Sequence, residues 1–311
     1  MRVKKLNFMS LLCSIKFACF LSLIGYGQCF GVQCRTKVTF IYRGYEGHTL
    51  LAENLHHLLE DKNFDKSKPT AIYTYGFLET PFMPSVRAVL DAYLKDGNHN
   101  FMIVHCDSIF LYNAFNAEQI ADDITDSLLK FYESGYDKFH LVGFSLGAQI
   151  AGVVGRKVIK NSDGRFKIPR ITGLDPGKLM PLLGISIANL NYDDANFVDI
   201  IHAETKYFGT AEAIGHANFW VNGGISQPMC KSRIFIIVSV CSHLQAPVYW
   251  AEIVSSQNPK IFQSQKCENY DKFLNNQCNT SEATSMGLYV NLQSRGNFYL
   301  QTNHEPPYSK N

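Results

Sequence analysis

From residue 37 onwards, short apolar runs alternate with longer segments whose apolar residues recur at helical spacing. Strands that alternate with helices are joined by crossover connections and pair in parallel. Buried parallel strands are almost continuously apolar, as in the runs HLVGF and VDIIH. The sequence therefore predicts an α/β fold in which helices flank a central, mostly parallel sheet. The expected strands are residues 37–43, 70–77, 100–107, 138–145, 170–176 and 197–204, and the expected helices are residues 85–96, 116–135 and 146–158.

One serine, Ser145, lies where an expected strand meets an expected helix. It is the centre of a G-x-S-x-G pattern, which at average residue usage arises by chance in roughly one chain in ten of this length. Its position carries more weight, because α/β-hydrolases hold a nucleophilic serine on the tight turn between a strand and a helix. Gly143 and Gly147 would allow the close approach of helix and strand that such a turn requires. Ser145 is therefore predicted to be a nucleophile rather than a polar turn residue.

A serine hydroxyl needs a base to accept its proton and a third group to orient that base. In the α/β-hydrolase order, an acid and then a histidine follow the serine. Asp175 ends the next expected strand, where a loop can reach the base, although an aspartate before proline is also a common turn residue. His243 follows Cys241 closely and precedes a helix-like segment, which favours it as the base. Of the other downstream histidines, His202 ends a strand, His216 is expected to be buried and structural, and His304 lies in a polar tail.

Residues 1–27 are typical of a secretory signal peptide. Basic residues precede an apolar stretch that ends near Ile24, and small residues favour cleavage near Gly27. The alternative is an uncleaved membrane anchor, but Lys16 interrupts the apolar stretch and leaves only a short clean core. No second candidate span occurs in the sequence. Residues 28–311 are therefore expected to form one secreted, soluble domain.

Seven of the nine cysteines lie beyond the expected signal peptide, so at least one is free or pairs between molecules. Two pairs, Cys230–Cys241 and Cys267–Cys278, each enclose ten residues and are expected to close local loops. Cys34–Cys106 could tie down the N-terminal segment and leave Cys29 over, although spacing alone does not fix this pairing. Asn279 begins an N-glycosylation sequon.

The chain closely resembles the pancreatic lipase family of secreted α/β-hydrolases in five segments taken in order: GFSLGAQIAG, TGLDP, FVDIIHAE, GHANFWVNGGISQPMC and CSHLQA. The resemblance runs from about residue 38 to residue 290. It implies an α/β-hydrolase fold with a catalytic triad of Ser145, Asp175 and His243.

The resemblance also implies an oxyanion hole made by two backbone N–H groups, those of Phe77 and Leu146. Such donors stabilise the tetrahedral intermediate of acyl transfer. Family members usually carry His-Gly at the start of the first of these two loops, whereas this chain has Tyr75 before Gly76. The glycine keeps the turn permissive, and the tyrosine leaves the exact placement of the loop open.

The family's lid is the segment between the two cysteines that precede the catalytic histidine, and long lids accompany triglyceride hydrolysis. Here Cys230 and Cys241 enclose only ten residues, and the facing segment, residues 205–214, is also short. Short versions of both resemble the phospholipase A1 members, in which an open site can admit a polar head group. The apolar part of the lid would dip into a lipid surface, unless it is a hairpin packed against the body. The expected lid residues are Lys231, Ile234, Phe235, Ile236, Ile237 and Val238.

The resemblance thus implies a secreted serine esterase that hydrolyses the sn-1 acyl ester of phospholipids at a lipid–water interface. The alternatives are a triglyceride or galactolipid lipase, or a non-enzymatic lipid-binding protein of the yolk type. The chain ends too soon for the family's C-terminal β-sandwich domain, so no colipase partner is expected. Nothing in the sequence indicates an oligomeric state.

No metal or organic cofactor is expected. In some relatives a calcium loop with two aspartate ligands precedes the strand FVDVIH, whereas the corresponding stretch here offers Asn191 and Asp194. Calcium prefers carboxylate ligands, so no functional calcium site is predicted. The formal net charge is +2 and no basic run occurs, which argues against a nucleic-acid partner.

Overall fold

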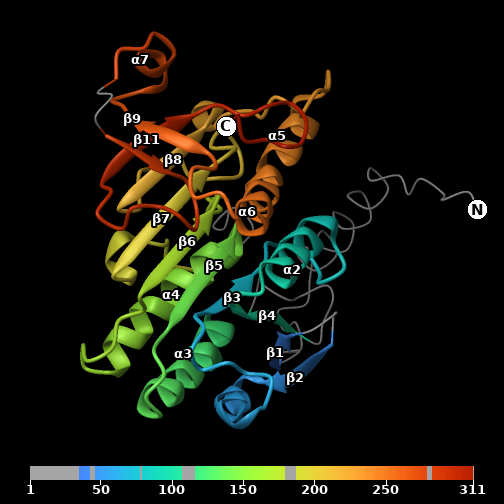
Figure 1. Ribbon diagram of the computed structural model, residues 1–311, viewed down its shortest axis with the longest axis vertical. Coiled ribbons are helices and arrows are strands. Elements are labelled where there is room, and N and C mark those ends of the chain that lie inside the picture. The colour runs from blue at the N-terminus through green and yellow to red at the C-terminus, as the bar shows by residue number, and fades with distance from the viewer. Residues whose placement is uncertain are drawn as a thin grey trace, which may run out of the picture. The chain divides into compact units, whose positions relative to one another are not determined.

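The computed structural model describes residues 35–42, 46–77, 79–106, 116–178, 187–278 and 282–310 (Figure 1). They belong to one compact unit, Cys34–Asn311. The expected signal peptide, residues 1–27, lies outside the described residues, as do Cys29, Cys34 and Asn279. Across the described ranges, no helix has the length and apolar character needed to cross a membrane.

Within the described residues, eleven strands pair in one sheet (Figure 1). They are β1 (Thr36–Ile41), β2 (Gly47–Leu51), β3 (Thr70–Thr74), β4 (Asn100–Cys106), β5 (Phe139–Phe144), β6 (Arg170–Leu174), β7 (Phe197–His202), β8 (Ala217–Val221), β9 (Gln263–Lys266), β10 (Ala283–Ser285) and β11 (Gly296–Leu300). Their order is β10-β9-β11-β8-β7-β6-β5-β3-β4-β1-β2. The strands from β11 to β4 in this order pair in parallel, and antiparallel pairs extend the sheet at both edges. The predicted mostly parallel sheet is confirmed.

Helices connect the central strands and cover both faces of the sheet. The described helical elements are η2 (Ala52–Glu60), α2 (Pro84–Asp96), α3 (Ala117–Glu133), α4 (Leu146–Asn161), η4 (Tyr192–Asp194), η5 (Asn222–Gly224), α5 (Phe235–His243), α6 (Gln245–Ser255) and α7 (Tyr270–Leu274). The chain moves one way along the sheet through α2 and the opposite way through α3 and α4. Because such crossovers are right-handed, α2 lies on one face and α3 and α4 lie on the other. Helix α6 packs beside α2, and α3 packs beside α4.

This double cover explains the apolar sequence of the central strands. Every residue of β3, β5 and β7 is buried, whereas β1, near one edge, alternates between buried and partly exposed residues. The ends of the helices follow local signals. Helix α2 begins with Pro84 in its first turn and ends at Gly97, whose φ of 66° is the left-handed conformation that favours glycine.

The register of three central strands decides where the site forms. Phe144 at the end of β5 pairs with Leu174 at the end of β6, and Leu174 pairs with Ile201 on β7. The residues that follow these positions therefore leave the sheet side by side at the carboxyl ends of the strands. In open parallel sheets, binding sites lie at these carboxyl ends.

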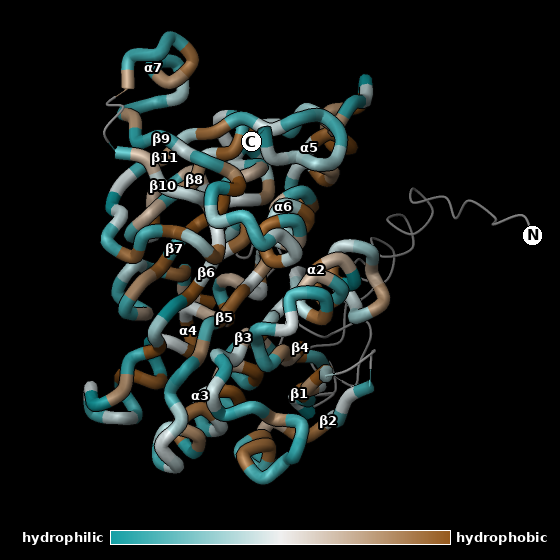
Figure 2. The backbone as a smooth tube through the Cα atoms, in the orientation of Figure 1, coloured by the Kyte–Doolittle hydropathy of each residue, from teal (hydrophilic) through white to brown (hydrophobic). Residues whose placement is uncertain are grey.

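The structure agrees with the predicted elements and adds others, namely β2, η2 and η4 in the first two thirds of the chain and several elements beyond residue 204. All six expected strands and all three expected helices occur within a few residues of their predicted bounds. The strands after β7 and the helix α5 were not among the expected elements. Figure 2 shows α5 as a strongly hydrophobic segment, and its sequence lacks the apolar–polar periodicity that marks an amphipathic helix.

Candidate active site

Ser145 occupies a strained turn between β5 and α4. Its backbone has φ 52° and ψ −117°, outside the helical and extended regions, and α4 begins at the next residue. A serine before a helix commonly accepts a hydrogen bond from the first turn, but the Ser145 side chain forms no such cap. Strain held at one serine whose hydroxyl is not used for capping is typical of a functional position.

The two glycines beside Ser145 are required by close backbone contacts. A Cβ built at Gly147 would lie 2.0 Å from the Thr74 carbonyl oxygen, and one built at Gly143 would lie 2.3 Å from the Gly147 oxygen. Any side chain at these positions would push the start of α4 away from β3 and β5. The predicted close approach of helix and strand is confirmed.

Asp175 leaves β6 beside Ser145, also with a positive φ of 45°. The Ser145 N–H donates to the carbonyl of Leu174 at 2.9 Å, which ties the two turns together. The Asp175 carboxylate is fully buried and accepts the backbone N–H groups of Ala203 at 2.8 Å and Glu204 at 3.0 Å. These donors hold the carboxylate in one orientation away from water.

His243 is the last residue of α5, and its imidazole reaches the Asp175 carboxylate. The Nδ1 atom lies 2.6 Å from Oδ2 of Asp175. The ring also contacts Phe144, at 4.7 Å between centroids, and Phe208, at 5.4 Å. Because a carboxylate only accepts hydrogen bonds, the proton belongs on Nδ1, and Nε2 is the nitrogen left to exchange a proton. Phe144 immediately precedes Ser145, so the imidazole lies beside the serine turn.

The other downstream histidines have structural surroundings. His202 is fully buried, stacks on Trp220 with centroids 3.9 Å apart, and lies 3.1 Å from the Thr210 carbonyl. His216 accepts the Val198 N–H at 3.0 Å. Burial lowers the pKa of both imidazoles, which favours their neutral forms. His304 is exposed.

The two expected oxyanion segments lie against each other. Leu146 is the first residue of α4, and Phe77 follows the end of β3. A Cβ built at Gly147 would lie 2.7 Å from the Tyr75 carbonyl oxygen, so the loop after β3 touches the start of α4. Tyr75 itself is buried. The use of the Phe77 and Leu146 N–H groups as an oxyanion hole stays a prediction.

The expected lid is a helix at its apolar end. The segment leads into α5 from Lys231, and the helix begins at Phe235, so the alternative of a packed hairpin is wrong. Its first turn projects into solvent. The exposed fractions are 55% for Ile234, 63% for Phe235, 41% for Ile236 and 50% for Ile237.

Two disulfides occur among the described cysteines, Cys230–Cys241 and Cys267–Cys278, and both predicted pairings are confirmed. The first joins the two ends of the lid segment two residues before His243. Such a cross-link restricts the unfolded chain and fixes the segment that carries the imidazole. The backbone of Cys106 lies in β4, and its expected partner Cys34 is outside the described residues.

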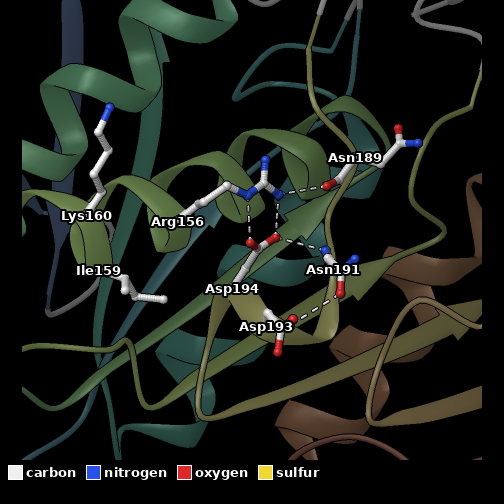
Figure 3. Close-up of a pocket in the computed structure, with 7 residues that line it drawn as sticks. All are labelled: Arg156, Ile159, Lys160, Asn189, Asn191, Asp193 and Asp194. Atoms are coloured by element: carbon white, nitrogen blue, oxygen red, sulfur yellow. Dashed lines mark hydrogen bonds and ion pairs between the residues drawn. The ribbon is translucent and has the colours of Figure 1, made fainter. Parts of the chain in front are cut away.

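The stretch with Asn191 and Asp194, for which the sequence predicts no calcium site, is held by an arginine (Figure 3). The figure shows Arg156 of α4 pointing toward Asp194 of η4, with its Nε and one terminal nitrogen 2.9 Å and 2.8 Å from the two carboxylate oxygens. Burial raises the pKa of Asp194, and the guanidinium acts in the opposite direction. Asn191 caps the same turn and donates its N–H to Asp194 at 2.8 Å. No group of three or more potential metal ligands occurs among the residues that the structure describes.

A cavity of about 600 Å³ lies beside this ion pair and is separate from the serine turn. Arg156 is ten residues along α4 from Leu146, which corresponds to about 15 Å of helix. The cavity therefore has no place in the chemistry at Ser145. Its lining residues are Arg156, Ile159, Lys160, Asn189, Asn191, Asp193 and Asp194.

The structure reveals supporting residues that the sequence patterns did not indicate. Glu204 accepts the N–H groups of Tyr207 at 3.1 Å and Phe208 at 2.9 Å, and so shapes the short loop whose Phe208 ring contacts His243. A Cβ at Gly209 would lie 2.6 Å from Oδ1 of Asp175. Gly209, in the run KYFGT, is the only sign in the sequence of this close approach, and its contact with Asp175 arises only after folding.

Comparison with known proteins shows the family of the chain. The family model described as Lipase matches residues 34–308. A phospholipase A1 from Vespa crabro is 27% identical over 289 residues, covering 86% of this chain and 91% of that protein. A pancreatic triacylglycerol lipase from Cavia porcellus is 27% identical over 275 residues, covering 72% of this chain and 57% of that protein. Lipase member H from Mus musculus is 30% identical over 222 residues, covering 68% and 48%.

This chain thus spans about half the length of the pancreatic triacylglycerol lipase and of lipase member H, and most of the Vespa crabro phospholipase A1. The family match covers the strands, the serine turn and the histidine helix together. With its α/β-hydrolase sheet, the chain belongs to the lipase family.

Proposed function

We propose that the protein is a secreted serine esterase that hydrolyses the sn-1 acyl ester of phospholipids. Ser145 is the nucleophile, His243 is the base and Asp175 orients the imidazole. The strongest support is the 2.6 Å contact between His243 and Asp175 at the sheet edge where the Ser145 turn lies. Membership of the lipase family supports ester hydrolysis, and its relatives include proteins named for phospholipase A1 and for triacylglycerol lipase activity.

The proposed reaction has two acyl-transfer steps. The Ser145 hydroxyl oxygen attacks the ester carbonyl while Nε2 of His243 accepts the hydroxyl proton. The Asp175 carboxylate stabilises the imidazolium that forms, and the N–H groups of Phe77 and Leu146 donate to the developing oxyanion. Collapse of the tetrahedral intermediate breaks the ester bond, and His243 returns the proton to the departing alcohol. Water then hydrolyses the acyl-enzyme by the same sequence.

The preference for phospholipids is inferred from the lid. The two cysteines of the lid are eleven positions apart. The facing loop, residues 205–214, lies against Asp175 at Gly209. We infer from these short segments that a polar head group can reach the serine turn. Side-by-side turnover of a phosphatidylcholine, a galactolipid and triolein tests this inference. The phospholipid should be hydrolysed fastest and at the sn-1 position, whereas faster cleavage of triolein would favour the triglyceride lipase.

A non-enzymatic lipid-binding protein is the other alternative. A fluorophosphonate reacts with an activated serine, so it should label Ser145 of the native protein. If the fluorophosphonate does not label Ser145 and the protein still binds phospholipid vesicles, the carrier is favoured over the enzyme. The Asp175–His243 contact favours the enzyme, because a carrier has no need of an oriented imidazole.

The exposed start of α5 is proposed to contact the lipid surface. Its apolar side chains project into solvent, while its last residue, His243, is buried at the site. Apolar side chains on an interfacial helix enter the boundary between head groups and acyl chains. This contact would bring the serine turn to the lipid, in keeping with a secreted enzyme that acts at a lipid–water interface.

Replacing both Phe235 and Ile236 by serine should separate interfacial from soluble activity. Turnover of phospholipid vesicles should fall roughly tenfold or more, because burial of each such side chain contributes about 1.5–3 kcal/mol. Turnover of a water-soluble ester should change little. Leu274→Ser is the control, because Leu274 is a similarly exposed apolar residue on α7. Equal losses on both substrates would contradict the proposed contact.

A further inference from the structure

Glu79 is a buried residue whose carboxylate joins the loop after β3 to the start of α2. Its side chain is only 7% exposed. Oε2 accepts the Gly76 N–H at 2.8 Å, and Oε1 accepts the Ser85 hydroxyl at the start of α2. The Glu79 backbone N–H also donates to the Gly76 carbonyl oxygen at 3.3 Å. One residue therefore fixes both polar groups of Gly76.

The last of these bonds determines the direction of the Phe77 N–H. The Gly76 carbonyl and the Phe77 N–H belong to the same planar peptide unit and point in opposite directions when the bond is trans. Holding the carbonyl on Glu79 therefore aims the Phe77 N–H away from Glu79. Gly76 has no side chain of its own to restrict the rotation of this unit. The Glu79 N–H supplies that restriction from outside, and the Glu79 carboxylate is itself anchored by the Gly76 N–H and the Ser85 hydroxyl.

Glu79 is also close to the imidazole of the site. A Cβ built at Gly76 would lie 2.9 Å from Cδ1 of Phe144, and the Phe144 ring contacts His243. Burial raises the pKa of Glu79, whereas the hydrogen bonds from Ser85 and Gly76 and the positive form of His243 act to lower it. A negative charge at Glu79 would therefore favour the imidazolium.

We propose that Glu79 is a positioning residue. Its carboxylate, bound to the Gly76 N–H and the Ser85 hydroxyl, keeps Glu79 in the place from which its backbone N–H holds the Gly76 carbonyl, and so the Gly76–Phe77 peptide keeps the orientation needed to stabilise the oxyanion. This inference rests on the proposed esterase reaction. The Glu79 carboxylate thereby helps to order a turn that begins with Tyr75 and Gly76. Glu79 does not touch the substrate, and it acts through the Phe77 N–H.

The test compares Glu79→Ala with Glu79→Gln on a short-chain, water-soluble nitrophenyl ester. Alanine should lower kcat by about 10²-fold, the usual effect of losing one oxyanion donor, with little change in KM. Glutamine should restore most of kcat, because its amide oxygen can accept from Gly76 while its amide N–H donates to the Ser85 oxygen. Ser85→Ala, which removes one partner of the carboxylate, should give a smaller loss and remains measurable if Glu79→Ala fails to fold.

Glu252→Ala is the matched control. The Glu252 carboxylate on α6 also accepts two backbone N–H groups, those of Tyr308 at 2.7 Å and Ser309 at 2.9 Å. Its removal should lower the midpoint of urea unfolding and leave kcat unchanged. If Glu252→Ala and Glu79→Ala lose kcat equally, Glu79 contributes only to the general stability of the fold, and the proposal is contradicted.

The pH dependence gives a readout that a merely structural role would not change. With glutamine at position 79, the charge that favours the imidazolium is gone, so the acidic limb of kcat/KM should shift to lower pH. Burial raises the pKa of Glu79 in the folded protein, so its contribution to stability is present at low pH and is lost as the pH rises. Glu79→Gln should therefore gain stability relative to the native protein as the pH rises above the ordinary pKa of a glutamate.

The failures of the two proposals are distinguishable. A native protein that neither hydrolyses the soluble ester nor reacts with a fluorophosphonate would overturn the esterase itself. An active native protein with unchanged kcat in Glu79→Ala would overturn only the role of Glu79. A Glu79→Gln variant as slow as Glu79→Ala would also contradict that role, because glutamine keeps the hydrogen bonds.

Discussion

Replacing Ser145 by alanine is expected to abolish ester hydrolysis while the fold stays intact. The proposed attack needs the Ser145 oxygen, and loss of a catalytic serine lowers kcat by about 10⁶-fold in a well-studied serine hydrolase. Alanine keeps the Cβ, and the Ser145 hydroxyl forms no cap that the helix would lose. Hydrolysis of a soluble ester and labelling by a fluorophosphonate should both disappear, with an unchanged circular dichroism spectrum.

Ser162→Ala provides the matched control for this variant. Ser162 is a buried serine at the opposite end of α4, where its hydroxyl donates to backbone carbonyls. Its loss should lower stability slightly and leave turnover at the native level. Hydrolysis by Ser145→Ala at more than a hundredth of the native rate would exclude Ser145 as the nucleophile.

Asp175→Asn is expected to lower kcat by about 10⁴-fold, as when the carboxylate that orients a catalytic histidine becomes an amide. The charge that stabilises the imidazolium is lost. Whichever way the amide turns, its NH₂ group also faces a backbone donor, either Ala203 or Glu204. A buried N–H without an acceptor costs about 1–3 kcal/mol. The midpoint of urea unfolding should therefore fall together with kcat.

The control for this second variant is Asp194→Asn. Asp194 is also a buried carboxylate, but its partner is Arg156 instead of a histidine. Its replacement should destabilise the protein and leave kcat of the folded fraction unchanged. If both variants lose activity only in proportion to unfolding, Asp175 has no orienting role.

The elements that carry local signals could be predicted from the sequence. The strand before Ser145 is almost continuously apolar, the glycines around Ser145 permit a tight turn, and Asp175 follows the next apolar run. Helix α5 was harder to predict because FIIVSV is rich in β-branched residues, which have low helix propensity. The helix is fixed by tertiary structure, namely the disulfide at Cys241 and the contact of His243 with Asp175.

The supporting residues could not be predicted, because each acts through a contact between distant parts of the chain. Gly209 matters because it lies against Asp175, more than thirty positions earlier. Phe208 matters because its ring meets an imidazole from another helix. Glu79 lies close in sequence to Gly76, but its importance depends on its burial and on its hydrogen bonds with Gly76 and Ser85. Sequence spacing carries none of this information.

The matched register of β5, β6 and β7 has a consequence for how such a chain can change in evolution. Inserting one residue inside Arg170–Leu174 would displace Asp175 by about 3.3 Å and turn successive side chains to the opposite face of the sheet. Insertions in the connecting loops would leave the ends of the strands aligned. Length variation among descendants of this protein should therefore accumulate between the strands and be absent within them.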